Sequence, residues 1–175
     1  MKKFFLIVFS TIVSGVLIAC SPAHSPISVT QEVSQSNEKN VYRLNIETQY
    51  LLYIIDGKKI IEGRLNVPDF GDMKKGDLVY FTDGNGGQAI CSITSVGRYD
   101  SFNKMLVSEG VINMLPQIDP NTNSSEEMLL KGTKIYRSFP GYKEGVKIYG
   151  AISFGLKFLT DESVANIEIV NVNDA

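Results

Sequence analysis

The chain has 175 residues, of which 43% are hydrophobic, 21% charged and 10% aromatic, and its formal net charge at pH 7 is −2. This composition is typical of a globular protein with one domain, and it excludes disordered, collagen-like and repeat architectures. His24 is the single histidine, and the two cysteines are Cys20 and Cys91. Histidine-based zinc sites, Ser-His-Asp triads and scaffolds with several disulfides therefore lack the residues that they need.

The first residues have the pattern of a sorting signal. Lys2 and Lys3 precede an uncharged, mostly apolar stretch from Phe4 to Ala19, which is shorter than the roughly 20 residues of a membrane-spanning helix. This pattern predicts a signal peptide over residues 1–19. A plain secretory signal or a membrane anchor with a chance cysteine is the alternative.

The end of this stretch, Leu17-Ile18-Ala19-Cys20, resembles the lipobox of bacterial lipoproteins, in which the cysteine becomes the acylated N-terminus. The resemblance implies that Cys20 carries a lipid such as palmitate. We then expect the protein to lie in the bacterial cell envelope, anchored to a membrane and facing away from the cytoplasm.

Charge and composition divide the remaining chain into three parts. Residues 20–40 contain five serines and two prolines but no aromatic residue, so they read as a flexible tether behind the lipidated cysteine. Residues 41–159 hold 14 bases and 13 acids together with every tyrosine, and they are the expected domain. Residues 160–175 form an acidic tail with four acids and no base.

The domain is expected to begin with a strand, a helix and a second strand. Polar and apolar residues alternate over Arg43–Ile46, which predicts a strand, and apolar residues recur at helical spacing over Thr48–Ile55. Asp56-Gly57 then gives a helix C-terminal signal. Residues Lys58–Leu65 are rich in β-branched side chains and predict the second strand.

A hairpin is the next expected element. Leu78–Phe81 and Ala89–Val96 read as strands, and the turn between them, Asp83–Gly87, has residue types that suit positive φ angles. Cys91 lies among apolar residues of the second strand, with no base nearby to stabilise a thiolate. We therefore interpret Cys91 as a buried core thiol and not as a nucleophile.

Short helices and a long strand complete the pattern. Ser101 can cap a helix that runs to Val107, a further helical turn is expected over 111–115, and Ser124 with Glu127 makes a capping box for a helix over 125–131. The stretch 146–158 predicts a closing strand, with bends or bulges at its glycines. The fold class expected from these elements is α+β, with a small, mostly antiparallel, barrel-like sheet and short covering helices.

One segment combines charges in a way that suits a ligand site. In Gly57-Lys58-Lys59-Ile60-Ile61-Glu62-Gly63-Arg64-Leu65, Glu62 and Arg64 are two residues apart, which places them on the same face of a strand. An acid beside a guanidinium can offer a ligand both an acceptor and donors. The alternative is an ordinary surface ion pair, worth about 0–1 kcal/mol.

This segment resembles the second strand of the ASCH family, within the PUA-like superfamily, whose motif is of the type G-x-K-[TS]-x-E-x-R. Gly57, Lys59, Glu62 and Arg64 match the motif, whereas Ile60 stands where the family usually has a hydroxyl residue. Other segments match in order along residues 41–158. They are Lys75–Val79, Arg98–Phe102, Met105-Leu106, Leu115-Pro116, Ile135–Arg137, Glu144 and Tyr149–Ile152.

The resemblance implies a PUA-like β-barrel and two possible functions. Many members are regarded as RNA-binding modules, and a bacterial branch hydrolyses the amide of acylated cytidines with a lysine, a threonine and a glutamate. By position, Lys59 matches the lysine and Glu62 stands where that branch has threonine. The third residue stays open between Glu109 and Glu144.

We favour binding over amide hydrolysis, because Glu62 beside Lys59 would hold the lysine in its protonated form. The expected ligand is a nucleotide, a nucleoside or RNA, in a cleft lined by the motif strand, with no cofactor or metal. A non-catalytic module for interactions in the envelope is the remaining alternative. The candidate ligand-binding residues are Lys59, Glu62, Arg64, Tyr136, Arg137 and Glu144, and in an enzyme Lys59 and Glu62 would be catalytic.

Bases and aromatic residues are interleaved near the end of the domain. Between Met128 and Leu159 there are six bases and one acid, Glu144, with four aromatic residues among them from Tyr136 to Tyr149. Arginine and tyrosine in such an arrangement can contact phosphates and stack on bases. The alternative is that the aromatic residues belong to the core and the lysines to a solvated face.

Overall fold

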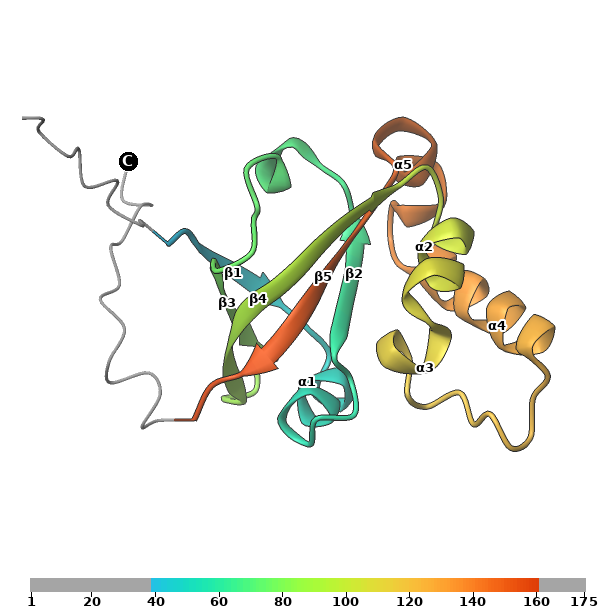
Figure 1. The fold of residues 1–175 in the computed structure, drawn as a ribbon, viewed down its shortest axis with the longest axis horizontal. Coiled ribbons are helices and arrows are strands. Elements are labelled where there is room, and N and C mark those ends of the chain that lie inside the picture. Colours follow the sequence, from blue (N-terminus) through green and yellow to red (C-terminus); the bar gives the residue numbers. More distant parts are fainter. Residues whose placement is uncertain (1–38, 161–175) are drawn as a thin grey trace, which may run out of the picture. The chain divides into compact units, whose positions relative to one another are not determined.

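A computed structural model describes residues 39–160 of the chain, and Figure 1 shows a sheet with helices gathered beyond one of its edges. The elements in chain order are β1 (Val41–Asn45), α1 (Thr48–Ile55), β2 (Ile61–Leu65), the 3₁₀ turn η1 (Pro68–Phe70), β3 (Leu78–Thr82), β4 (Gln88–Tyr99), α2 (Phe102–Glu109), α3 (Val111–Met114), α4 (Ser125–Ser138), α5 (Tyr142–Tyr149) and β5 (Ala151–Phe158).

The five strands form one sheet in the order β1-β3-β4-β5-β2. β1 pairs with β3 in parallel, whereas the other three pairings are antiparallel. The long strands β4 and β5 cross the middle of this twisted sheet (Figure 1). The α+β class with a mostly antiparallel, curled sheet and short covering helices is thus confirmed.

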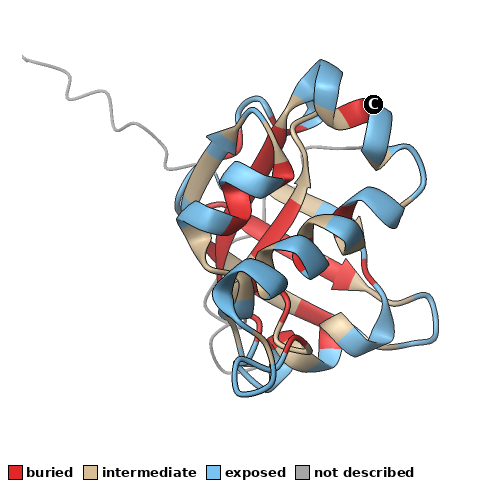
Figure 2. Cartoon of the chain, turned by 90° about the vertical axis from the view of Figure 1, so that its right-hand side faces the viewer, coloured by how far each residue is buried: buried red, intermediate tan, exposed pale blue. Residues whose placement is uncertain are grey.

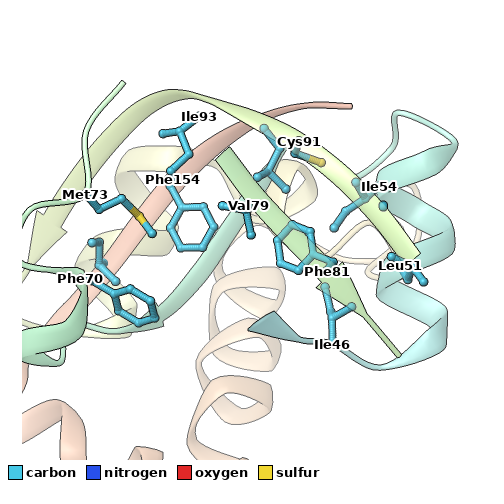
Figure 3. Packing of buried hydrophobic residues seen from close by; sticks show 13 residues of the cluster. Ile46, Leu51, Ile54, Phe70, Met73, Val79, Phe81, Cys91, Ile93 and Phe154 are labelled. Atoms are coloured by element: carbon cyan, nitrogen blue, oxygen red, sulfur yellow. The ribbon is translucent and has the colours of Figure 1, made fainter. Parts of the chain in front are cut away.

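Two hydrophobic clusters fill the fold. The first lies between the sheet, α1 and η1, and Figure 3 shows Phe81, Phe154 and Cys91 among its side chains. The second joins the helices α2, α3 and α4 to the start of β5, with Phe102 and Met105 fully buried within it. Figure 2 shows the result, with buried residues along the strands and exposed residues on the outer faces of the helices.

Several local predictions are confirmed. α1 spans the predicted Thr48–Ile55, and β3 and β4 form the predicted antiparallel hairpin. The Ser101 side chain accepts a hydrogen bond from the backbone N–H of Lys104 at the start of α2. Ser124 and Glu127 form both hydrogen bonds of the capping box at the start of α4.

The predicted closing strand over 146–158 is wrong in its first part. Residues Tyr142–Tyr149 form the helix α5, which ends at Gly150 with a φ of 73°, and β5 begins only at Ala151. Gly150 can adopt this positive φ at little cost, so the chain leaves the helix and enters the strand at that residue. Gly155 does lie opposite an irregularity, because β4 shifts register between Ile93 and Ser95.

Two other boundaries also differ from the prediction. The second strand begins at Ile61 rather than Lys58, because Lys58 and Lys59 both donate their backbone N–H to Tyr53 O and so extend the end of α1. α4 continues to Ser138, beyond the predicted end at residue 131, since its inner face packs into the second cluster through Gly132 and Tyr136.

Cys91 is fully buried in the first cluster, as predicted. Burial raises the pKa of its thiol to about 12. The signal peptide, Cys20 and nearly all of the tether lie outside the described residues, as does the acidic tail beyond Thr160. Within residues 39–160, none of the helices has the length and apolar character to cross a bilayer.

Candidate functional site

A pocket of about 440 Å³ opens beside β2, where the end of β1 and the start of α1 approach α3 and the turn between α4 and α5. Its lining combines buried charges with aromatic rings. The lining residues are Asn45, Ile46, Glu47, Tyr50, Lys59, Glu62, Gly63, Arg64, Asp83, Leu115, Tyr136, Phe139, Pro140 and Tyr142.

Lys59 lies at the buried end of the pocket, with 3% of its surface exposed. The chain leaves α1 through Gly57, whose φ of 69° suits glycine, and then runs back so that the Lys59 side chain points inward. Its Nζ donates to Met114 O at 2.6 Å and to Ile61 O at 3.0 Å, and it forms an ion pair with Glu62 Oε2 at 3.0 Å. The three N–H groups of the ammonium therefore each have an acceptor.

Glu62 and Arg64, on β2, complete a cluster that we call the ion triad, consisting of Lys59, Glu62 and Arg64. Glu62 is 6% exposed, and its Oε1 accepts a hydrogen bond from Arg64 Nε at 2.7 Å. Arg64 Nη2 donates to Asn45 O at 2.7 Å, which ties β2 to the end of β1. The interpretation of Glu62 and Arg64 as a surface ion pair is therefore wrong, because the glutamate is buried.

The charges of the ion triad stabilise one another against the cost of burial. Burial alone raises the pKa of Glu62, but the positive charges of Lys59 and Arg64 outweigh it and hold that pKa below its ordinary value. Burial lowers the pKa of Lys59, and the attraction of Glu62 opposes this shift. Burial also acts to lower the pKa of Arg64, but Glu62 raises it overall.

Aromatic side chains form the walls of the pocket. Phe102, in the core behind it, stacks on Tyr136 with a centroid distance of 5.0 Å and on Tyr142 with one of 5.6 Å, which fixes both tyrosine rings. On the opposite wall, the Tyr50 hydroxyl accepts a hydrogen bond from Gln117 Nε2 at 2.9 Å. The Lys59 ammonium lies 5.4 Å from the centre of the Tyr50 ring, within the range of a cation–π contact.

Gly63, between the two motif charges, leaves room for these walls. A Cβ at this position would lie 2.6 Å from the Tyr136 hydroxyl and 2.7 Å from the Met114 terminal methyl. A larger residue here would force the ends of these side chains to move. Glycine at this position therefore lets the Tyr136 ring and the methionine methyl groups pack close to β2.

The structure brings together four of the six predicted ligand-binding residues. Lys59, Glu62, Arg64 and Tyr136 all line the pocket. Arg137 lines a second hollow, and Glu144 is exposed and bonded to Lys147.

Neither candidate for a third catalytic residue lines the pocket. The other candidate for the third catalytic residue is Glu109. Its carboxylate accepts hydrogen bonds from the hydroxyls of Tyr99 and Ser153, each at 2.5 Å.

Several lining residues had no signal in the sequence. Glu47 lies between a predicted strand and a predicted helix, Tyr50 lies in that helix, and Asp83 lies in a predicted turn; none of them was predicted to bind a ligand. They reach the pocket because β1 and β3 pair in parallel, which places the turn after β3 beside the start of α1. The Thr48 hydroxyl bonds Asp83 Oδ2 at 2.9 Å across this junction.

Comparison with known proteins agrees with the fold and the motif. The model of the ASCH domain family matches residues 44–160. The hypothetical protein PH0355, known from a crystal structure, shares 29% sequence identity with this chain. The two structures superpose with a TM-score of 0.58, and the match covers 68% of this chain and 99% of that one. Protein PF0455 from Pyrococcus furiosus, whose structure was solved in solution by NMR, shares 28% sequence identity with this chain. Its TM-score is 0.52, and the match covers 68% of this chain and 97% of that one.

A more distant structure is that of ASCH from Zymomonas mobilis, at 10% identity and a TM-score of 0.44, covering 74% of this chain and 82% of that one. No curated protein matches the sequence. The family match covers the motif strand, the pocket and nearly all of the described residues.

Proposed function

We propose that this chain, which belongs to the ASCH domain family, binds the base of a nucleoside, a nucleotide or an RNA strand in the pocket beside β2. The observation that carries the proposal is the combination of a buried ion triad with aromatic walls around about 440 Å³. Pockets for small ligands span roughly 300–1,000 Å³ and pair apolar walls with a few fixed polar groups.

The ion triad can read the edge of a base. Each oxygen of the Glu62 carboxylate has one partner in the ion triad, and a carboxylate oxygen can accept a further hydrogen bond. Arg64 has five N–H groups: Nε bonds Glu62, one on Nη2 bonds Asn45 O, and the guanidinium also interacts with the Tyr142 hydroxyl, which leaves further N–H groups for a ligand. An acceptor beside a donor complements bases, which present amino and carbonyl or ring-nitrogen groups side by side.

The aromatic walls suit a flat ligand. Tyr50, Tyr136, Phe139 and Tyr142 all line the pocket, and the stacking on Phe102 holds two of them in place. Base stacking on an aromatic side chain contributes about 1–3 kcal/mol and works with every base. The walls would thus supply affinity and the ion triad selectivity.

Lys59 favours binding over amide hydrolysis. A lysine that acts as nucleophile must direct a free electron pair of Nζ at its substrate. Burial lowers the pKa of Lys59, but Nζ is bonded to three acceptors, namely Met114 O, Ile61 O and Glu62 Oε2, and these occupy its remaining directions. Glu62, one of these three acceptors, stands where the hydrolytic branch has threonine. The lysine therefore serves to position Glu62 and the loop of Met114.

Anchoring to a membrane through a lipid on Cys20 is part of the same proposal. Its support is the sequence Leu17-Ile18-Ala19-Cys20 after an uncharged stretch. A binding domain held in the envelope by a tether would meet ligands that are free outside the cytoplasm.

A ligand screen tests the proposal. We expect the unfolding midpoint of the full-length chain, held in mild detergent, to rise with a nucleoside, a nucleotide or a short RNA. Arg64→Lys should fold but lose at least tenfold in affinity, since an ammonium cannot reproduce the planar guanidinium fork. Arg43→Lys, which alters an exposed arginine outside the pocket lining, is the control. The proposal fails if no such ligand binds, or if both variants bind as tightly as the wild type.

A further inference from the structure

The charges around the pocket are unevenly distributed. Its lining includes three acids and two bases, and both bases, Lys59 and Arg64, already pair with Glu62. The other two acids, Glu47 and Asp83, belong to the solvent-facing part of the lining, where Glu47 is exposed and Asp83 half-buried. The mouth of the pocket is therefore negative, although its floor is not.

Asp83, one of the two acids of the mouth, is held in its charged form by the hydrogen bonds around it. Asp83 accepts hydrogen bonds from the backbone N–H groups of Asn85 and Gly87, each at 2.8 Å, and from the Thr48 hydroxyl at 2.9 Å. The bonds from Asn85 and Thr48 are the main causes that lower the pKa of Asp83. Glu47 has no basic partner among the described residues, so nothing in residues 39–160 neutralises it by direct contact.

The bases that would attract a phosphate lie elsewhere. Lys134, Arg137 and Lys143 line the second hollow, of about 420 Å³, and none of them lines the pocket. A ligand whose base enters the pocket would direct its remaining part toward the open end. A phosphate there would approach two carboxylates, and the two bases of the lining, Lys59 and Arg64, both pair with Glu62.

From this arrangement we propose that the pocket selects unphosphorylated nucleosides, and that Glu47 and Asp83 are the residues that determine this specificity by repelling a 5′-phosphate. The inference rests on the proposed function and narrows its ligand class. Like charges several ångströms apart repel each other, and the effect on exposed groups weakens as salt is added, because the Debye length falls to about 10 Å at 0.1 M. The ribose hydroxyls of a nucleoside can instead donate hydrogen bonds to carboxylates at the mouth.

Calorimetric titration of the full-length chain tests the inference with four probes, namely cytidine, adenosine and their 5′-monophosphates. At low salt we expect each nucleoside to bind at least tenfold more tightly than its monophosphate. The ratio of the nucleoside affinity to the monophosphate affinity should fall at least threefold in Glu47→Gln and in Asp83→Asn. It should also fall at high salt. Asparagine can keep the turn of Asp83 because its side-chain oxygen accepts the same backbone hydrogen bonds.

Glu126→Gln is the matched control, since Glu126 is exposed at the start of α4 and does not line the pocket. It should leave the ratio at the wild-type value. The inference is overturned if a monophosphate or a short RNA binds as tightly as the nucleoside, or if neither mouth variant changes the ratio relative to this control. If no nucleoside, nucleotide or RNA binds the wild-type chain, the proposed function itself is overturned.

Discussion

Lys59 is the residue of the ion triad whose loss should cost the fold most. In Lys59→Met, Glu62 would keep only Arg64 as a partner, and Ile61 O and Met114 O would lose the ammonium. Breaking a buried ion pair from one side costs about 3–5 kcal/mol. We expect a loss of that size in the free energy of unfolding measured with urea.

Lys58→Met is the control for this substitution. Lys58 pairs with Asp56 at 3.0 Å, but its side chain is 60% exposed. Such surface pairs contribute about 0–1 kcal/mol. Equal losses in Lys58→Met and Lys59→Met would contradict the account of Lys59 as a buried structural cation.

Cys91 gives a prediction about pH. Burial raises the pKa of its thiol from an ordinary value of 9.0 to about 12, so the fold favours the protonated form. This contribution to stability is present below pH 9 and is lost as the pH rises toward 12, because the unfolded chain then gives up the proton first.

The same shift protects Cys91 from thiol reagents. In a Cys20→Ser background, iodoacetamide near pH 9 should label Cys91 only after urea unfolds the chain, as mass spectrometry of the Cys91 peptide would show. Equal labelling rates in the native and unfolded chains would show that Cys91 is accessible.

At the scale of single residues, the sequence predicted which charged residues lie together better than it predicted how deeply they are buried. The spacing of Glu62 and Arg64 placed them together, and both line one pocket. Their burial could not be predicted from spacing, because it depends on helices that follow far along the chain and cover β2. Tyr50 and Asp83 were missed for the same reason, since long-range pairing brings their segments to the pocket.

Among the elements, α4 connects helix capping to the site. It begins at the capping box of Ser124 and Glu127 and carries Tyr136 into the pocket wall. Ser124→Ala removes the acceptor for Glu127 N, which lies at 3.2 Å, and should lower the free energy of unfolding by about 1 kcal/mol.

Ser125→Ala is the matched control, because Ser125 is the first residue of the helix and does not provide the cap. Urea unfolding of both variants measures the difference. A loss in Ser125→Ala as large as that in Ser124→Ala would show that the capping box does not stabilise α4.

Local signals predicted most elements, and the exception has a physical cause. Capping residues and the hairpin turn act within a few residues, and α1, α2 and the β3–β4 hairpin formed as predicted. The stretch Tyr142–Tyr149 has β-branched and aromatic residues that favour a strand, but it packs as α5 against α4 and β2. Tertiary packing outweighs local propensity there.

For the whole molecule, the class of fold was predictable but the order of strands was not. The sheet places β1 beside β3 and β5 beside β2, so both edges come from the first half of the domain. These pairings depend on contacts between residues far apart in sequence, which composition and periodicity do not encode. The pocket exists only because of this order, since it joins the end of β1 to the middle of β2.

The membrane anchor is also a property of the whole chain, and its test is a single substitution. Cys20→Ala should abolish acylation, so the protein should leave the membrane fraction or retain its signal peptide unprocessed. Cell fractionation shows which fraction holds the protein, and an immunoblot of each fraction shows whether its mass is that of the processed or the unprocessed chain. A variant that stays in the membrane fraction at the mature mass would show that Cys20 is not the anchor.

The most direct measurement of the central claim is a titration of the ¹⁵N-labelled full-length chain with cytidine or adenosine, followed by NMR. We predict saturable shifts of the backbone amides of Tyr50, Gly63, Arg64 and Leu115, which surround the pocket. The amides of Leu130 and Thr133, at the second hollow, should shift little. Shifts that cluster at the second hollow, or no shifts at millimolar nucleoside, would contradict the claim that the pocket beside β2 binds a base.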